Sequence, residues 1–261
     1  MEKRYLSPSE VANATINAGI TKAKLSITRM LLLGIFAGTF IGFGAFGDIV
    51  VMQTFKSIDV GVMKLIGASV FPVGLMLVVI AGAELFTGNC LMTMAIMDKK
   101  ITLGEMLKNW FFVYLGNFIG AVLLAFIVFK SDLLQGNVLK MAASIGTAKL
   151  SLSFQAAFLR GILCNIIVVL AVWLGAAALD VVSRLFAIWF PIMLFVLSGY
   201  EHSIANMFFM SLAKFAGINV SWLTIWTANL IPVTLGNIVG GAIIVPVVYY
   251  IAYILPAKKT Q

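Results

Sequence analysis

Charged residues and histidine are scarce in this sequence, and their scarcity argues against an ordinary soluble domain. Charged residues make up 11% of the 261 residues, whereas a typical soluble domain has about 25%. Hydrophobic residues make up 62%, and the mean hydropathy is +1.07. The two cysteines, Cys90 and Cys164, both lie in apolar context, so we interpret them as packed thiols rather than as a disulfide or a metal site. The composition predicts a membrane protein, for which we expect no metal and no cofactor.

Long stretches with little charge occupy most of the chain. A helix of about 20 apolar residues crosses the hydrocarbon core of a bilayer. The candidate crossings cover residues 30–47, 65–83, 109–129, 161–179, 185–200 and 215–257. The sequence therefore predicts an all-α membrane protein with six transmembrane helices. The first apolar run begins near residue 27, behind a charged segment without an Ala-x-Ala-like cleavage site, so no cleavable signal peptide is expected.

The net charge of +8 comes mainly from lysines and arginines in the segments that flank these runs. In a soluble protein such a charge would suggest nucleic acid as a partner. In a membrane protein it sets the orientation, because basic residues favour the inner side. With six crossings and the N-terminus inside, eleven of the 18 basic residues lie on the inner side. We expect a multi-pass protein of the inner (plasma) membrane, surrounded by lipid, with both termini cytoplasmic and no nucleic-acid partner.

Two short motifs inside the apolar runs resemble each other. GAELFTGN (82–89) and GYEHSIAN (199–206) share glycine, glutamate and asparagine at identical spacing. A second pair, GNFIGA from Gly116 and GNIVGGA from Gly236, follows at intervals of 34 and 37 residues. These matches predict two copies of a three-helix unit. An odd number of crossings places the copies in opposite orientations, as in the inverted repeats of transporters and aquaporin-like channels.

The segment before the first crossing is predicted to form an amphipathic helix on the inner membrane surface. Ser7 and Glu10 have the spacing of a capping box, and Pro8 fits the first helical position. The helix is either an anchor or a gate under the pore mouth. Its apolar face is expected to contain Val11, Ala14, Ala18 and Leu25.

The chain is thus predicted to hold one channel domain between two short cytoplasmic segments. The N-terminal amphipathic helix covers residues 1–28, and the C-terminal tail covers 256–261. The six-span domain covers residues 29–255, with repeat one at about 29–130 and repeat two at about 156–255.

The second and fifth crossings are expected to be broken helices. Residues 65–97 form 33 residues with one charge, Glu84, and a straight helix of that length would overshoot a bilayer at about 1.5 Å per residue. Gly82 and Gly88 bracket the expected break, and Gly199 marks the corresponding one. Irregular backbone at membrane depth is tolerated where it is buried in protein or lines a water-filled cavity. Interrupted helices at matching positions therefore point to a substrate path.

The polar residues at these breaks leave two questions open. The N–H groups that begin a half-helix suit an anion, and Thr87 and His202 add a hydroxyl and an imidazole there. Glu84 and Glu201 either mark a cation or proton route or have a structural role, in which they accept backbone N–H groups or pair with asparagines. His202 is either a core histidine or a functional one, and its place in a break as the only histidine favours function.

The sequence resembles the formate/nitrite transporter family over about residues 10–255. The motifs that carry this resemblance are FPVGLMLVVIAGAELFTGN, KNWFFVYLGNFIGA, GYEHSIANMFFM and NLIPVTLGNIVGG. The resemblance implies an aquaporin-like fold that assembles as a homopentamer with one pore in each protomer. It also implies transport of small monovalent anions of weak acids: formate, nitrite or hydrosulfide. The overall look of the chain suggests a hydrosulfide-channel member, although no single residue determines the substrate.

The resemblance also implies roles for individual residues. The central polar pair would be Thr87 and His202. The outer constriction would be formed by Phe71, Leu75 and Phe195, and the inner one by Leu85 and Val168, with Phe86 beside it. The vestibule and its polar network would contain Lys149, Asn165, Glu201 and Asn229.

Two mechanisms and several rival functions remain distinguishable by experiment. His202 either donates a proton, so that the substrate crosses as the neutral acid, or only donates a hydrogen bond to a conducted anion. The alternative function is an aquaporin-like channel for neutral small solutes, but the chain lacks Asn-Pro-Ala and has no arginine deep in a span. An intramembrane enzyme is disfavoured because His-Glu-x-x-His and Gly-x-Gly-Asp are absent. A purely structural scaffold does not account for two matching polar breaks.

Overall fold

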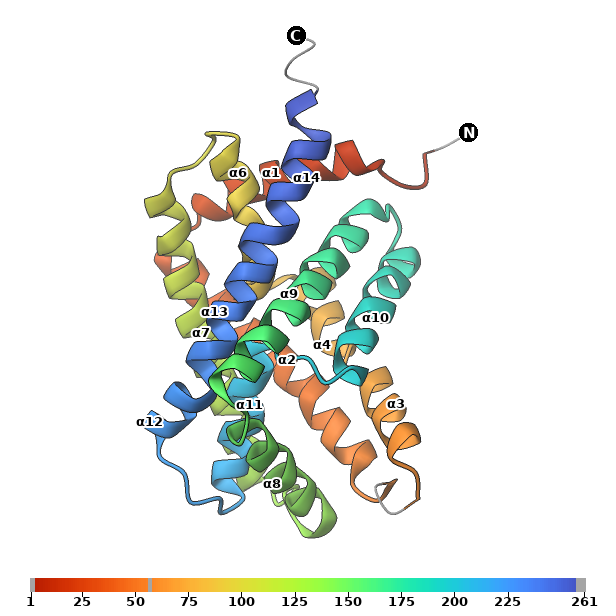
Figure 1. The fold of residues 1–261 in the computed structure, drawn as a ribbon, viewed down its shortest axis with the longest axis vertical. Helices are drawn as coiled ribbons and strands as arrows, with labels where there is room; N and C mark the ends of the chain where they lie inside the picture. The colour runs from red at the N-terminus through yellow and green to blue at the C-terminus, as the bar shows by residue number, and fades with distance from the viewer. Residues whose placement is uncertain (1–2, 56–57, 257–261) are drawn as a thin grey trace.

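The fold of the chain is almost entirely helical, as Figure 1 shows. The computed structural model describes residues 3–55 and 58–256, and in these residues the only β-type pairing is an isolated bridge between Tyr5 and Ala178. The first half contains α1 (Pro8–Ala23), α2 (Ile27–Met52), α3 (Val60–Val70), α4 (Val73–Met76), the π-helix η2 (Leu77–Gly82), α5 (Phe86–Asn89), η3 (Cys90–Met92), α6 (Thr93–Met97) and α7 (Leu103–Lys130). The second half contains α8 (Gly136–Leu150), α9 (Phe154–Ala177), α10 (Val181–Leu197), α11 (Ser203–Phe215), α12 (Trp222–Ile225), η4 (Trp226–Leu230), α13 (Ile231–Ile238), η5 (Val239–Ile244) and α14 (Val245–Tyr253). The predicted all-α class is confirmed.

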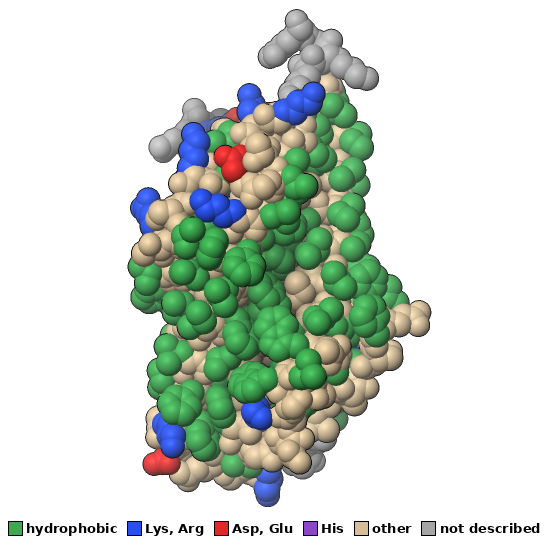
Figure 2. All heavy atoms as spheres, turned by 90° about the vertical axis from the view of Figure 1, so that its left-hand side faces the viewer, with side chains coloured by type: hydrophobic (Ala, Val, Ile, Leu, Met, Phe, Trp, Pro, Cys, Tyr) green, Lys and Arg blue, Asp and Glu red, His purple; other side chains and the backbone are tan. Residues whose placement is uncertain are grey.

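Five helical stretches of the described chain are long and apolar enough to cross a membrane. They are Ile27–Met52, Val60–Gly82, Leu103–Lys130, Phe154–Ala177 and Trp222–Tyr253. Two shorter apolar helices, Phe86–Met97 and Val181–Leu197, accompany them. Figure 2 shows a broad hydrophobic band on one side of the molecule, with lysines and arginines gathered at the two ends. The chain is therefore a multi-pass membrane protein.

The last apolar run begins later than the sequence suggested. Residue 215 is the end of α11 and not the start of a crossing. Gly217, with φ of +98°, turns the chain there, and the next helix begins at Trp222. The predicted C-terminal tail, 256–261, lies outside the described residues except for residue 256.

Two glycines with positive φ end helices inside the bundle. The stretch from α3 to η2 ends at Gly82, where φ is +91°, and the chain is extended until α5 begins at Phe86. After α10, Gly199 has φ of +70°, and α11 begins at Ser203. Glycine adopts this conformation without the steric penalty that a Cβ imposes. Gly88, which was expected to bracket the first break, lies within α5 instead.

The N-terminal helix α1 packs against the protein rather than presenting the expected face. Figure 1 shows it lying across the end of the bundle from which the C-terminal helix emerges, and it contacts α6 and η3. Its buried residues include Val11, Ala12 and Ile16, whereas Ala18 is exposed. The predicted cap is present: Glu10 accepts the Ser7 N–H at 2.8 Å. Hydrogen bonds from Lys3 and Ser7 lower the pKa of Glu10 to about 2.

Glycines allow the two longest helices to touch along their backbones. Gly34 of α2 faces Gly116 of α7, and the next pair along is Gly38 against the Asn117 backbone. An added Cβ at Gly120 would overlap the backbone carbonyl of Ile35. Small residues at membrane helix contacts permit this close approach. These glycine contacts fix how α2 and α7 are aligned along each other, and the site requires this alignment.

Replacing Gly120 by alanine should destabilise the fold, because backbone cannot move aside as a flexible side chain can. We expect a loss of about 1–3 kcal/mol, measured as a lower unfolding temperature in detergent. Gly104→Ala on the same helix is the matched control, since an added Cβ there meets nothing within 4 Å. Equal stability of the two variants would show that the α2–α7 contact has room to spare.

Candidate functional site

Thr87 and His202 meet in the middle of the protein although 115 residues separate them in the sequence. Thr87 lies in the first turn of α5, and His202 is the N-cap of α11. Thr87 Oγ1 lies 2.8 Å from His202 Nε2. Both side chains are buried, with 0% and 3% exposure. The two helix breaks thus place Thr87 and His202 in hydrogen-bonding contact.

The contacts of His202 define its tautomer. The Ala205 backbone N–H donates to Nδ1 at 3.1 Å, so Nδ1 carries no proton. In a neutral imidazole the proton is then on Nε2, which donates to Thr87 Oγ1. The Thr87 hydroxyl proton remains available for another acceptor. Protonating Nδ1 would set two N–H groups against each other, so the cap holds His202 as a neutral hydrogen-bond donor.

Two cavities approach this pair from opposite directions. The first, which we call the Lys149 cavity, has a volume of about 340 Å³ and is lined by Phe71, Phe195 and His202 as well as Lys149. The second, the Lys22 cavity, has a volume of about 400 Å³ and is lined by Leu75 and Leu85 as well as Lys22.

A much smaller space of about 10 Å³, which we call the waist, lies between the cavities. It shares Phe71, Phe195 and His202 with the Lys149 cavity and Leu75 and Leu85 with the Lys22 cavity. The three spaces therefore follow one another along a single path. The polar group at the waist is the imidazole; the other lining side chains are apolar.

Five of the six predicted constriction residues line the waist, and one does not. Those at the waist are Phe71, Leu75, Leu85, Val168 and Phe195, joined by Ile41 and Ile192, which the sequence did not indicate. Phe86 instead lies in a lateral groove, with its ring 5.5 Å from Trp110 and 4.9 Å from Tyr114. Successive helical residues point about 100° apart, so Phe86 and Thr87 cannot face the same space.

A single asparagine satisfies the backbone at the first break. Asn117 Nδ2 donates to the carbonyls of Gly34 and Glu84 at 2.8 and 2.9 Å. Its Oδ1 accepts the Phe86 N–H at 3.0 Å. One buried side chain thus pairs two polar groups of the interrupted backbone, which in hydrocarbon would each cost several kcal/mol if left unpaired, and also binds a carbonyl of α2.

The second break has the same arrangement. Asn237 Nδ2 donates to the carbonyls of Gly161 and Glu201 at 2.8 and 3.0 Å. Its Oδ1 accepts the Ser203 N–H at 2.9 Å. The two asparagines follow the glycines of the repeated GN pairs, Gly116 and Gly236. That repetition was the sequence signal for them, although it had been interpreted only as evidence of duplication.

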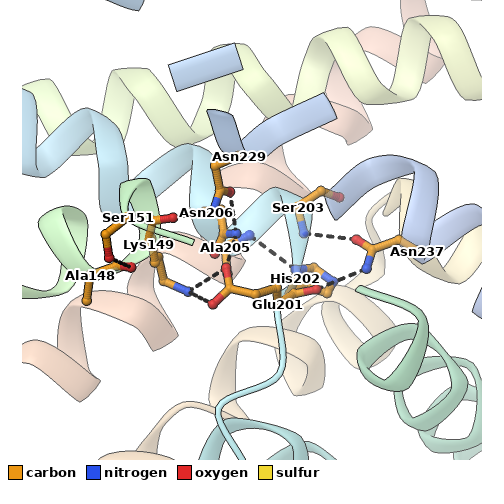
Figure 3. A network of polar contacts seen from close by, with 10 residues as sticks. All are labelled: Ala148, Lys149, Ser151, Glu201, His202, Ser203, Ala205, Asn206, Asn229 and Asn237. Atoms are coloured by element: carbon orange, nitrogen blue, oxygen red, sulfur yellow. Dashed lines mark hydrogen bonds and ion pairs between the residues drawn. The ribbon is translucent and has the colours of Figure 1, made fainter. Parts of the chain in front are cut away.

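The carboxylate of Glu201 is fully engaged, as Figure 3 shows. Lys149 Nζ lies 3.0 and 3.1 Å from its two oxygens. Asn206 Nδ2 donates to Glu201 at 2.6 Å and to Asn229 Oδ1 at 2.8 Å. Asn229 then donates to the Lys149 carbonyl at 3.0 Å, which closes the ring of contacts. Asn229 therefore supports Lys149 rather than contacting the imidazole.

Glu84 has a matching network, in which the asparagine contact was one of the expected alternatives and the lysine was not foreseen. Lys22 Nζ donates to Glu84 at 2.7 Å, and Asn89 Nδ2 donates to the same carboxylate at 2.7 Å. Asn89 also donates to Asn109 at 2.8 Å, and Asn109 donates to the Lys22 carbonyl at 3.1 Å. Lys22 was missed because α1 supplies it from outside the apolar runs.

Asn165 lies directly beside the central pair. Its Nδ2 donates to the Asn237 carbonyl at 2.7 Å and to the Thr87 carbonyl at 3.3 Å. Asn165 thus connects Asn237, which pairs the backbone at the second break, to α5, the helix that begins after the first break. Within residues 3–55 and 58–256, no group of three or more His, Cys, Asp or Glu side chains is placed so that it could hold a metal ion.

The fold and the site together define a membrane transport protein: apolar helices surround a path of two cavities that one waist interrupts. The chain belongs to the formate/nitrite transporter family, whose model matches residues 9–251. It is accordingly a transporter and not an enzyme.

Individual relatives are similar over nearly their whole length. The chain is 41% identical to "Uncharacterized transporter YrhG" of Bacillus subtilis, covering 95% of this chain and 94% of the relative. It is 38% identical to "Formate channel BtFdhC" of Bacillus thuringiensis, covering 95% and 96%. Among solved structures, "Pentameric formate channel with formate bound" superposes with a TM-score of 0.77 at 34% identity, covering 87% of this chain and 97% of that one.

Removing the asparagine that pairs the backbone at either break, Asn117 or Asn237, should unfold the site. Asn237→Ala leaves two buried backbone groups of the break, the Ser203 N–H and the Glu201 carbonyl, without this partner, at about 1–3 kcal/mol each. We expect Asn237→Ala and Asn117→Ala to lower the unfolding temperature in detergent by similar amounts. Asn13→Ala is the control, because Asn13 is exposed and makes one local hydrogen bond. A variant at Asn237 as stable as the Asn13 variant would contradict the bracing role.

Proposed function

We propose that the protein conducts small monovalent anions of weak acids, with formate as the first candidate and nitrite and hydrosulfide in the same class. The observation that carries the proposal is His202, bonded to the buried Thr87, at a waist between two cavities that each hold a lysine. The relatives that are described as formate channels support it. They do not favour the alternative of a neutral-solute channel.

The arrangement of charge favours anions over cations. α5 has Thr87 in its first turn and α11 has His202 as its N-cap, and helix N-termini carry partial positive charge. Glu84 and Glu201 are each paired with a lysine and an asparagine. They therefore add no uncompensated negative charge, which favours the structural role for both carboxylates.

Of the two mechanisms for the histidine, the geometry favours hydrogen bonding. Nδ1 is occupied by the Ala205 N–H, so His202 offers a fixed donor and has no free site at which to store a proton. Thr87 accepts from Nε2 and can turn its own proton toward the substrate. Bare charge is costly in an apolar waist of this size, and this donor pair lowers the cost.

The finer architecture follows from the paired networks. We infer six crossings in two inverted three-helix repeats, in which α10 and α11 together form the fifth crossing. The contacts of Asn117 match those of Asn237, and this match supports a common origin of the two halves. The domain limits of 29–255, with repeats at about 29–130 and 156–255, remain part of this proposal.

The orientation and assembly are also proposals. Lys22 ends α1, at the end of the bundle where both termini lie in Figure 1, and the basic-residue count favours that end as cytoplasmic in the inner membrane. The Lys149 cavity then opens outward. A homopentamer with one pore per protomer is supported by the structure described as a pentameric formate channel. The α7 face, with exposed Leu107, Phe111 and Leu115, is apolar enough for a subunit or lipid contact.

The anion proposal predicts a definite substrate profile. Purified protein in liposomes should carry formate, nitrite and hydrosulfide in direct flux measurements, and should not accelerate swelling in glycerol. The waist excludes a hydrated polyol, whereas a small weak acid can shed its water against Thr87 and His202. Glycerol swelling without formate flux would instead establish a neutral-solute channel.

The central pair can be tested with near-isosteric changes. Thr87→Val removes the hydroxyl at constant shape, and His202→Phe removes the ring donor. Each should slow formate flux about ten- to a hundredfold, since a hydrogen bond to a charged group contributes about 1.5–3 kcal/mol. Thr87→Ser keeps the hydroxyl and serves as the control. Unchanged flux and unchanged pH dependence in His202→Phe would remove the histidine from the mechanism.

A further inference from the structure

The Lys149 cavity contains a carboxyl group that the two paired networks do not use. Besides the Lys149–Glu201 ion pair, the cavity is lined by Lys64 of α3, Arg160 of α9 and Asp48 of α2. Lys64 and Arg160 are exposed, and neither makes an ion pair with any described residue. The cavity is therefore positive overall, by an amount that depends on the charge state of Asp48.

Asp48 lies where α2 and α3 are in close contact. Its side chain is 4% exposed, and its Oδ1 has no hydrogen-bond partner among the described residues. Gly67 packs against this oxygen so closely that an added Cβ would overlap it, and Met52 fills the adjacent space. A carboxylate buried without a donor is costly, and a protonated carboxyl costs much less. The surroundings of Asp48 therefore suit a carboxyl group that can exist in its neutral, protonated form.

Other ionisable groups share the cavity and must be considered with Asp48. Those that line it are Lys64, Lys149, Arg160, Tyr200, Glu201 and His202. The other ionisable side chains on the helices packed against α2 do not line the cavity: Glu105, Lys108, Tyr114 and Lys130 of α7, Lys140 of α8 and Lys214 of α11.

We propose that Asp48 is a specificity-determining residue at the Lys149 entrance. As a neutral acid it leaves the cavity positive and anions enter, whereas its ionisation removes one unit of positive charge from the entry path and slows them. The effect belongs to one side of the membrane, because the charged residues that line the Lys22 cavity are Lys22 and Glu84, already paired with each other. The proposal rests on the anion transport proposed above.

The test compares Asp48→Asn with the parent protein in liposomes. Radiolabelled formate exchange at equal pH on both sides keeps the driving force constant while pH varies. At acid pH the two proteins should exchange formate at the same rate. At alkaline pH the variant should be faster by about two- to tenfold, as expected for one unit charge that acts on an anion across a partly aqueous cavity. Superimposable pH profiles would overturn the proposal.

Three controls separate this proposal from its alternatives. Asp59→Asn changes an exposed carboxylate at the start of α3, where asparagine also caps a helix, and should leave the profile unaltered. Asp48→Ser repeats the test should the asparagine variant fail to fold. A parent protein without formate exchange at any pH would contradict the anion transport itself rather than the role of Asp48.

Sidedness gives a second readout. In right-side-out membrane vesicles at fixed internal pH, alkaline external pH should slow the parent but not Asp48→Asn. Alkaline internal pH should affect the two proteins equally. If alkaline pH on either side slowed the parent equally, relative to Asp48→Asn, the effect would lie at the shared waist and not at the Lys149 entrance.

Discussion

The structure depends on satisfying backbone groups where helices break inside the membrane. No water is available there in hydrocarbon, so each unpaired N–H or carbonyl would be costly. Asn117 and Asn237 each pair two such groups with one side chain and also bind a carbonyl of the neighbouring helix. The glycine contacts between α2 and α7, and between α9 and α13, bring the backbone carbonyls within reach of these asparagines. A path through the bundle is compatible with a stable fold only because its irregular backbone is paired internally.

Charge at the site follows from the same principle. Glu84 and Glu201 each bind a lysine that comes from a helix outside the central breaks, α1 in one case and α8 in the other. An ion pair of this kind is costly to bury unless further hydrogen bonds complete it, and Asn89 and Asn206 supply them. The carboxylates thereby hold the lysines at the cavity walls, and the waist retains only neutral donors.

Much of this could be predicted from the sequence, because the signal was local. Glycine, glutamate and asparagine at repeated spacing indicated both breaks, and the family resemblance placed Thr87 and His202 together. Lys22 could not be found in this way, since its partner Glu84 is 62 residues away and the ion pair exists only once α1 has docked. Phe86 shows another limit: a motif fixes which residue follows a break, but the rotation of the new helix decides which space the side chain enters.

The two helix breaks have matching contacts but differ in chemistry, and selectivity can arise from that difference. Each break has an asparagine that pairs its backbone and a glutamate that binds a lysine. The waist, however, is lined by an imidazole from one break, which its own helix N-terminus holds neutral, and the other break contributes a hydroxyl that is hydrogen-bonded to this ring. Asp48 faces only the Lys149 side. A symmetric pore would respond alike to conditions on both faces, whereas one unpaired carboxyl at one entrance makes the two faces electrostatically different.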